Sequence, residues 1–170
     1  LEHVVQLGAG GAGSATAYAL CRLGVRRLSL FERDAAKAQG LAEQLSGLFP
    51  QTRIEVLSDN ERHIEALLEA RGLVNATPVG MHVHPGMPLS ESALRAGVLR
   101  EGLWVADVIY LPQETQLVRA ARAAGCEVLT GGYMAVGQAV DAFRLFTGLE
   151  PNAERMAAHF ETLIAAQQGV

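Results

Sequence analysis

The chain has 170 residues, of which 49% are apolar and 19% are charged, and it carries a formal net charge of −4. This length supports one domain with its own core, and the composition is typical of a folded protein rather than a disordered one. The negative charge argues against a broad nucleic-acid-binding face, and no apolar run approaches the roughly 18 residues of a membrane span. We therefore expect neither nucleic acid nor a membrane as a partner.

The two cysteines, Cys21 and Cys126, lie far apart and belong to no Cys-x-x-Cys pair. We expect buried, reduced thiols and a cytoplasmic protein. The chain begins at Leu1 rather than at a methionine and enters a strand pattern at once, so we interpret it as a piece of a longer protein. Lys37 is its single lysine among 14 basic residues.

The first apolar run, 3–7, is short, contains β-branched residues and precedes a group of glycines, which predicts a strand. Small and apolar residues then recur at helical spacing over 11–23. Gly24 is expected to close this helix as the residue just beyond its C-terminus. A second strand is predicted over 27–31.

The second helix is predicted over 35–48, with Asp34 as its N-cap. A short carboxylate at that position can accept hydrogen bonds from the free amides of the first turn. The apolar face of this helix should contain Leu41, Leu45 and Leu48.

The middle of the chain continues the alternation. A strand over 53–57, a helix near 61–70 and a strand over 73–76 are predicted. Residues 77–90 contain three prolines and two glycines and must form a loop. A short helix near 90–96 follows.

The run 104–110 is almost entirely apolar, which predicts a strand that is central in the sheet. A helix over 113–124, ended by Gly125, and a short strand over 127–129 come next. Aromatic residues interpreted as part of the core are Tyr18, Trp104 and Phe143.

Two helices without a following strand, near 133–146 and 151–167, complete the pattern, and Pro151 fits the first turn of the last one. Elsewhere strands and helices alternate. Right-handed crossovers should then build an α/β fold with a doubly wound, mostly parallel sheet and helices on both faces. The last two helices are expected to pack on something outside this sheet.

The connection between the first strand and the first helix, Gly8-Ala9-Gly10-Gly11-Ala12-Gly13, fits the pattern G-x-G-x-x-G. Glycine there allows a tight turn, close approach of a pyrophosphate to the backbone, and close packing of helix on strand. The helix N-terminus adds free amides and a partial positive charge. The turn predicts a dinucleotide site, with a purely structural turn as the alternative.

An acidic residue is expected about 20 residues after such a turn, where it can accept hydrogen bonds from a ribose. Glu32 stands 19 residues after Gly13. Nearby, Arg33 and Lys37 could hold a 2′-phosphate, whereas Glu32 and Asp34 would repel one. A solvated charged loop is the alternative interpretation of these four residues.

Two further segments follow predicted strands at their carboxyl ends, where open α/β sheets bind ligands. Residues 75–81, Asn-Ala-Thr-Pro-Val-Gly-Met, can face a nicotinamide ring or form a plain turn. Asp107 lies in an apolar strand and needs hydrogen-bonding partners if it is buried, and Tyr110 is a site residue or a core aromatic. No third ligand accompanies His82 and His84, so we expect no metal site.

Together these segments make the chain resemble the cofactor-binding half of the shikimate/quinate dehydrogenase family. The resemblance covers nearly the whole chain in order and spacing. Its segments are the turn 8–13, Glu32-Arg33-Asp34 with Lys37, and the stretches 75–81, 105–115 and 131–143. It implies a Rossmann-like dinucleotide-binding domain over 1–132 and helices over 133–170 that pack on an N-terminal substrate domain. In that family the substrate domain supplies a catalytic lysine–aspartate pair, so no catalytic residue is expected in this chain.

The resemblance also implies roles for individual positions. The turn 8–13 would bind pyrophosphate. NADP-dependent members read Asn-Arg-Thr after the second strand, followed by a second basic residue. Arg33 and Lys37 match the basic positions, while Glu32 and Asp34 depart from the pattern and favour NAD or dual use. Matching positions near the nicotinamide are Asn75, Ala76, Thr77, Val108, Gly131 and Met134, and those that touch the substrate are Tyr110 and Gln138.

The implied activity is reversible hydride transfer between NAD or NADP and shikimate, quinate or a related cyclohexane carboxylate. A non-catalytic NAD(P)-sensing module of a larger protein is the alternative. A methyltransferase that uses S-adenosylmethionine is disfavoured, because its glycine pattern lacks the full G-x-G-x-x-G register. Expected partners are the small-molecule substrate and, as a further candidate, a second copy in a homodimer.

Overall fold

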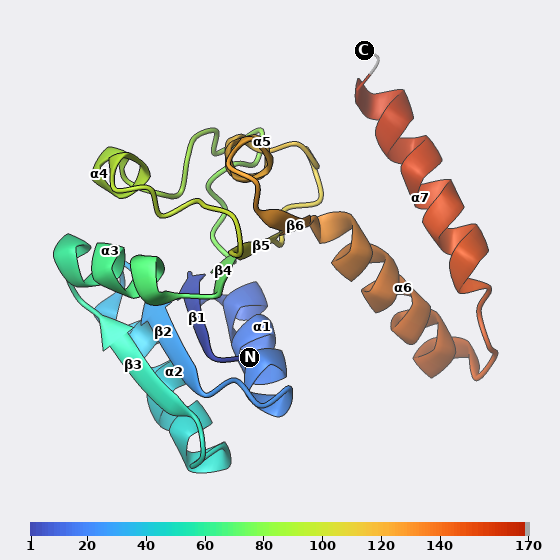
Figure 1. The fold of residues 1–170 in the computed structure, drawn as a ribbon. Helices are drawn as coiled ribbons and strands as arrows, with labels where there is room; N and C mark the ends of the chain where they lie inside the picture. Colours follow the sequence, from blue (N-terminus) through green and yellow to red (C-terminus); the bar gives the residue numbers. More distant parts are fainter. Residues whose placement is uncertain (169–170) are drawn as a thin grey trace.

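The structure is a computed structural model that describes residues 1–168 (Figure 1). These residues form one six-stranded sheet and seven helices. The strands are β1 (His3–Leu7), β2 (Arg27–Phe31), β3 (Arg53–Leu57), β4 (Gly72–Asn75), β5 (Trp104–Asp107) and β6 (Glu127–Leu129). The helices are α1 (Gly11–Arg22), α2 (Ala35–Leu48), α3 (Asn60–Glu69), α4 (Glu91–Arg95), α5 (Gln116–Ala123), α6 (Gly131–Thr147) and α7 (Ala153–Gln168).

The strand order is β3-β2-β1-β4-β5-β6, and every neighbouring pair is parallel. The chain runs outward from β1 to β3, crosses back to β4 and continues outward to β6. The predicted doubly wound α/β fold is confirmed, and the sheet is parallel throughout. The reversal of direction between β1 and β4 is the place where sheets of this kind bind ligands, beyond the carboxyl ends of the strands.

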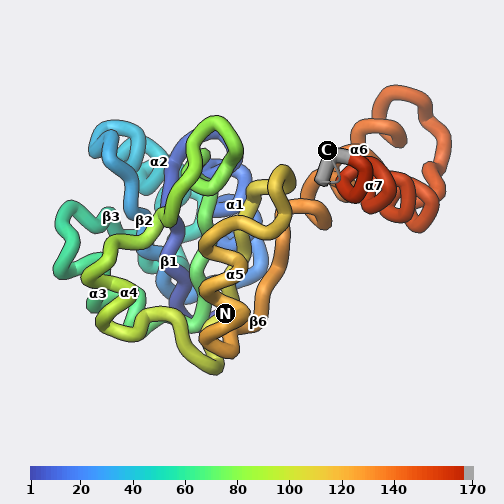
Figure 2. Tube along the Cα trace, turned by 90° about the horizontal axis from the view of Figure 1, so that it is seen from above, coloured from blue at the N-terminus to red at the C-terminus, as the bar shows by residue number. Residues whose placement is uncertain are grey.

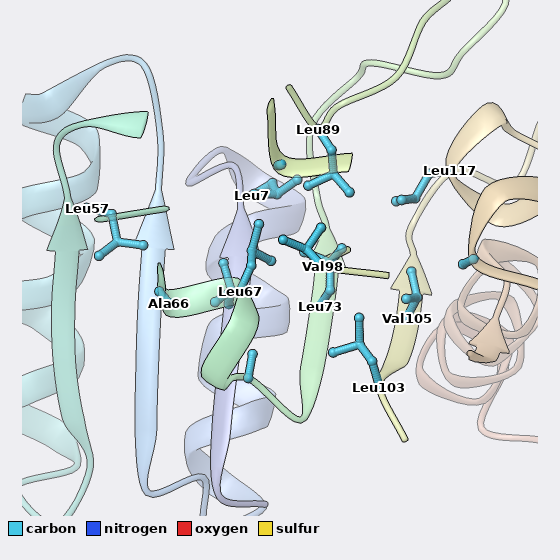
Figure 3. Packing of buried hydrophobic residues seen from close by; sticks show 14 residues of the cluster. Leu7, Leu57, Ala66, Leu67, Leu73, Leu89, Val98, Leu103, Val105 and Leu117 are labelled. Atoms are coloured by element: carbon cyan, nitrogen blue, oxygen red, sulfur yellow. The ribbon is translucent and has the colours of Figure 1, made fainter. Parts of the chain in front are cut away.

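Both faces of the sheet carry an apolar core, because successive strand residues point to opposite sides. Helices α3, α4 and α5 cover one face, where Leu7, Leu73, Leu103 and Leu117 are fully buried (Figure 3). Helices α1 and α2 pack on the other face, with Leu28 among the buried residues. Burial on both sides explains why the central strands are apolar without alternation.

The N-cap of α2 is Asp34, as predicted, and its side chain accepts hydrogen bonds from two first-turn amides. Gly24 and Gly125 both have positive φ just beyond helix ends, in agreement with their predicted role. The α2 prediction is wrong in one detail. Leu41 and Leu45 are buried, but Leu48 is 64% exposed.

The fifth strand is shorter and less central than predicted. It ends at Asp107, which pairs with Asn75, the last residue of β4, while β6 pairs only with 104–106. The strand lies second from the edge of the sheet. Helix α5 begins at Gln116 instead of Gln113, since the Thr115 hydroxyl caps it by accepting a hydrogen bond from the Val118 amide.

The prediction that Tyr18 and Phe143 belong to the core is also wrong. Tyr18 is 44% exposed and packs edge-on against Phe49 across α1 and α2, while Phe143 is 40% exposed on α6. Trp104 is half-buried on the sheet. Of the thiols, Cys21 is buried, but Cys126 is only half-buried.

Helices α6 and α7 pack on each other and project away from the sheet (Figures 1 and 2). Large apolar side chains on them stay open to solvent, with Leu145 82% and Phe146 88% exposed. The last helix starts at Ala153 rather than at Pro151, because Asn152 caps it through the Arg155 amide. Within residues 1–168 no helix is both long and apolar enough to cross a membrane.

His63 of α3 is a buried titratable group in the core. Its ring stacks on Phe31 of β2, with centroids 4.0 Å apart and planes 9° from parallel. Burial lowers the pKa of His63 to about 4, since the charged ring would lose its hydration without a compensating partner.

The free energy of unfolding should therefore fall as the pH decreases from about 6.5 to about 4. In that pH range His63 binds a proton in the unfolded chain but stays neutral in the folded chain. This difference lowers the free energy of unfolding by at most roughly 3 kcal/mol. His63→Phe keeps a planar apolar ring and should remove this contribution. Urea denaturation of both proteins near pH 7 and near pH 4.5 provides the measurement, because carboxylates titrate equally in both. An identical pH dependence in the two proteins would contradict the prediction.

Candidate functional site

The site is built where the turns after β1 and β4 meet. The Ala76 amide donates to the Leu7 carbonyl at 2.8 Å, and the Gly8 amide donates to the Phe31 carbonyl at 2.9 Å. These bonds carry the parallel pairing of the strands one step past their ends. The two turns are thereby held side by side at the reversal point of the sheet.

Three glycines of the first turn meet three different steric requirements. Gly8 has φ of +94°, and a Cβ there would lie 2.8 Å from the Ala76 carbonyl oxygen. A Cβ on Gly13 would lie 2.4 Å from the Gly8 carbonyl oxygen, so helix α1 packs too closely on the turn for any side chain. Gly10, the N-cap of α1, is exposed and has nothing within 4 Å of its Cβ position. Gly10 and Gly11 both leave open space, and of these two Gly10 lines the pocket beside the turn.

The turn is also held from below by Gln6, which the sequence analysis did not single out. Its Nε2 donates to the carbonyls of Gly8 at 2.9 Å and Gly13 at 2.8 Å, and its Oε1 accepts from the Thr16 hydroxyl at 2.9 Å. Gln6 is fully buried. A polar side chain inside the apolar strand that precedes the turn was the signal that could have identified it.

One end of the crevice is a pocket of about 400 Å³ beside the ends of β1 and β2. Glu32, Arg33 and Lys37 line it from one side, and Thr77 and Pro78 line it from the other. The structure thus brings together the charged residues after the second strand and the turn after β4, as expected for a pocket that holds an adenosine.

Glu32 is directed at the glycine turn. Its Oε2 accepts from the Ala9 amide at 2.9 Å and its Oε1 from the Asp34 amide at 3.1 Å. Partial burial by itself would raise the pKa of Glu32, but these donors and the nearby charge of Lys37 outweigh burial and lower it. The carboxylate is therefore charged at neutral pH and presents its remaining lone pairs to the pocket.

Two of the other charged groups after β2, Asp34 and Lys37, interact with each other. Lys37 Nζ lies 3.6 Å from Asp34 Oδ2, and both side chains are largely exposed. Asp34 caps helix α2 and does not line the pocket.

The opposite end of the crevice is a pocket of about 490 Å³ with a mostly apolar lining. It shares Ala76, Thr77 and Pro78 with the first pocket, so the two pockets adjoin at the turn after β4. The residues that complete its wall are Ala12, Met81, His82, Val83, Val108, Ile109, Tyr110, Leu111 and Met134.

Of the residues matched to the nicotinamide region, Ala76, Thr77, Val108 and Met134 line this pocket directly. Asn75 does not, because it is fully buried beneath the turn.

Gly131 is also buried and makes no wall of the pocket. A Cβ on it would lie 2.4 Å from the Val108 carbonyl oxygen, so Gly131 lets α6 start directly against the segment after β5. Tyr110 is 49% exposed at the rim, which excludes the core interpretation. Gln138 is exposed on α6, outside the described lining.

His82 is the lining residue for which the sequence analysis considered only a metal. Its loop, with His84, is exposed. Across residues 1–168 no group of three or more His, Cys, Asp or Glu side chains is placed to hold a metal ion. Asp107 is buried and has the hydrogen-bonding partners that its position requires.

The chain is similar in sequence to shikimate and quinate dehydrogenases. Residues 133–159 match the family model of the shikimate 5′-dehydrogenase C-terminal domain. The chain is 54% identical over 168 residues to the shikimate dehydrogenase (NADP(+)) of Arthrobacter sp. (strain FB24), covering 99% of this chain and 55% of that protein. It is 48% identical over 164 residues to the quinate/shikimate dehydrogenase (NAD(+)) of Corynebacterium glutamicum (strain R), covering 96% and 56%.

Two solved structures of such dehydrogenases have the same fold as this chain. The fold superimposes on quinate dehydrogenase from Corynebacterium glutamicum in complex with NAD with a TM-score of 0.85 and 46% identity, over 95% of this chain and 55% of that chain. For shikimate 5-dehydrogenase from Listeria monocytogenes in complex with shikimate and NAD, the TM-score is 0.81 at 28% identity, over 91% and 54%. The chain thus spans about half the length of the relatives it matches.

Gly10→Val should abolish dinucleotide binding while the fold stays intact, because the added side chain enters the open space of the crevice and meets no protein atom. Calorimetry with NAD measures the affinity, and thermal unfolding checks the fold. Gly47→Ala is the matched control, since it also adds a side chain to an exposed glycine with free space, but in the last turns of α2. An unchanged NAD affinity in Gly10→Val would exclude the turn as the binding site.

Proposed function

The chain belongs to the shikimate/quinate dehydrogenase family, as its C-terminal NAD(P)-binding portion, and we propose that it binds and orients NAD or NADP for reversible oxidation of a hydroxylated cyclohexane or cyclohexene carboxylate. The observation that carries this proposal is a pair of adjoining pockets beside the glycine turn, one charged and one apolar, which share Ala76, Thr77 and Pro78. A dinucleotide likewise has two chemically different ends, an adenosine with its polar ribose and a nicotinamide ring.

The residues fit such a cofactor at each point. The open space at Gly10 accepts the pyrophosphate, which the free amides and the dipole of the α1 N-terminus stabilise. Glu32 accepts hydrogen bonds from the adenosine ribose, while Arg33 and Lys37 lie beside it. At the apolar end, Thr77 and Met134 border the space for the nicotinamide.

The bound cofactor supplies the hydride acceptor or donor at its nicotinamide ring. This chain's residues hold that ring at the apolar end of the crevice and exclude water from one of its faces. Tyr110 at the rim and Gln138 on α6 are proposed to contact the ring substrate from this side. The proton transfer that accompanies oxidation of the hydroxyl is assigned to the substrate domain, because Lys37, the single lysine, lies in the adenosine pocket.

The proposal divides the chain into a dinucleotide-binding domain over 1–132 and helices over 133–170 that pack on the substrate domain. Exposed apolar residues on the projecting helices support this division, with Leu145, Phe146 and Leu149 all more than half exposed. Such side chains are rarely left in contact with water in a complete protein, and they mark a surface that another part buries.

Residues 1–170 expressed alone should bind the dinucleotide weakly and show no dehydrogenase activity. The proposed catalytic pair and the substrate-binding half belong to the other part of the protein. The measurement is NAD(P)H absorbance with shikimate or quinate, for this chain and for the full-length protein. Turnover by residues 1–170 would contradict the assignment of the catalytic groups.

The full-length enzyme should prefer NAD over NADP by about tenfold in kcat/KM, which corresponds to about 1.4 kcal/mol. The reason is that Glu32 is charged, accepts from the ribose and repels a 2′-phosphate. Relatives of this chain include both NADP and NAD enzymes, so the charges around this pocket should decide which cofactor is preferred.

Glu32→Asn should shift the preference toward NADP, with Arg33 and Lys37 then free to hold the phosphate. Glu32→Gln is the companion variant, because it removes the charge but keeps an oxygen at the reach of the Ala9 amide. The ratio of kcat/KM for the two cofactors measures the shift. If the unaltered enzyme favours NADP, the basic pair decides the cofactor and Glu32 serves mainly to hold the turn.

A further inference from the structure

Three buried polar side chains connect the ends of β4 and β5 with the start of α5. Asn75 and Asp107 are the last residues of their strands and face each other in register. Thr115 caps α5. All three are at most 2% exposed, so their hydrogen bonds are made away from water and are costly to lose.

Asn75 uses both ends of its amide group to shape the turn after β4. Its Oδ1 accepts from the Thr77 amide at 3.2 Å and from the Thr77 hydroxyl at 2.7 Å. Its Nδ2 donates to the Val79 carbonyl at 3.2 Å. The Val79 amide in turn donates to the Thr77 hydroxyl at 3.2 Å. The turn that borders both pockets is therefore folded around this one amide.

Asp107 orients that amide. Its Oδ1 accepts from Asn75 Nδ2 at 3.1 Å and from the Ile109 amide at 3.1 Å, while its Oδ2 accepts from the Thr115 hydroxyl at 2.7 Å. Burial raises the pKa of Asp107, and the three donors oppose that effect. Because a carboxylate only accepts, Asn75 has to present its NH₂ to Asp107, and its oxygen is left to face Thr77.

The segments tied together in this way form the wall of the apolar pocket. Thr77 and Pro78 come from the turn on one side, and Ile109 and Tyr110 come from the segment after β5 on the other. By contrast, the glycine turn is held by Gln6 and Glu32, which have no bond to this network. The turn after β4 borders both pockets, but only the apolar pocket takes a second wall from the segment after β5.

We propose that Asp107 is a positioning residue for hydride transfer: through Asn75 and Thr115 it sets the distance between the turn after β4 and the segment after β5, the two walls that hold the nicotinamide. The charged pocket has no wall from the segment after β5, so the adenosine end should keep its affinity. This inference rests on the proposed dinucleotide binding. It goes further by assigning the geometry of the reacting ring to a carboxylate that does not touch the cofactor.

The test uses the full-length enzyme and two measurements that separate the ends of the crevice. ADP-ribose carries the adenosine and pyrophosphate but no nicotinamide, and its Kd is measured by calorimetry. The kcat at saturating cofactor and substrate reports the position of the nicotinamide ring. In Asp107→Asn, which replaces one acceptor oxygen by a donor, kcat should fall about tenfold or more, while the Kd for ADP-ribose stays within about twofold.

A control variant tests for general destabilisation. Ser29→Ala removes the hydroxyl that bonds His3 Nε2 at 2.8 Å and Glu55 Oε1 at 2.6 Å, in another buried polar network of the same sheet that lines neither pocket. It should lower the melting temperature and leave kcat within about twofold. An equal loss of kcat in Ser29→Ala and Asp107→Asn would overturn the proposal.

If Asp107→Asn does not fold, Thr115→Val and Thr115→Ser provide the same comparison. Valine removes the donor to Asp107 and should lower kcat several-fold, whereas serine keeps the hydroxyl and should restore it. Unchanged kcat in the valine variant, or loss of ADP-ribose affinity in proportion to kcat, would overturn the inference. Failure of the unaltered enzyme to bind ADP-ribose would instead refute the proposed function.

Discussion

The close contact between the turn after β1 and the turn after β4 is the constraint on which the rest of the structure depends. A Cβ on Gly8 would lie 2.8 Å from the Ala76 carbonyl oxygen, and one on Gly13 would lie 2.4 Å from the Gly8 carbonyl oxygen. Only glycine permits both approaches at once. The two turns lie side by side where the strand order reverses, between β1 and β4. The crevice opens at this point, beyond the carboxyl ends of the strands.

Buried polar side chains hold each of these turns from inside. Gln6 fastens the glycine turn to β1, and Asp107 acts on the second turn through Asn75. Both sit in strands that are otherwise apolar, where an unpaired polar group would be costly. Gln6 forms three hydrogen bonds, to the Gly8 and Gly13 carbonyls and the Thr16 hydroxyl, and Asp107 accepts three, so each restricts its turn to one arrangement. The crevice is therefore rigid at its base although its rim is open.

The projecting helices α6 and α7 differ from the rest of the chain in how many apolar side chains they leave exposed. Gly131 and Gly132 are the buried residues of α6, and beyond them the helix carries its apolar side chains into solvent. Helix α7 returns beside it and covers part of that surface, while Leu145 and Phe146 remain exposed. The dinucleotide half of the chain completes its own core on the face covered by α3, α4 and α5. The helical pair does not, which is why we assign it to the contact with the substrate domain.

Much of the fold could be predicted because its signals are local. The alternation of apolar strands with helices, the glycine turn and the Asp34 cap each depend on residues within a few positions of one another. The end of β5 could not be predicted, because 108–110 are as apolar as the strand before them. Both neighbouring strands stop short of them, since β4 ends at Asn75 opposite Asp107 and β6 ends at Leu129 opposite Ala106.

The functional site could be predicted only in part for the same reason, because it depends on which strands lie side by side. The sequence by itself determined that a glycine-rich turn follows β1 and which charged residues follow β2, and it predicted a dinucleotide site at that turn. Only the tertiary structure decided that Glu32 bonds the Ala9 amide, that Asn75 lies behind the wall instead of in it, and that Asp107 orients it. Those facts depend on the register between strands that are more than 20 residues apart in the chain, and no local pattern encodes that register.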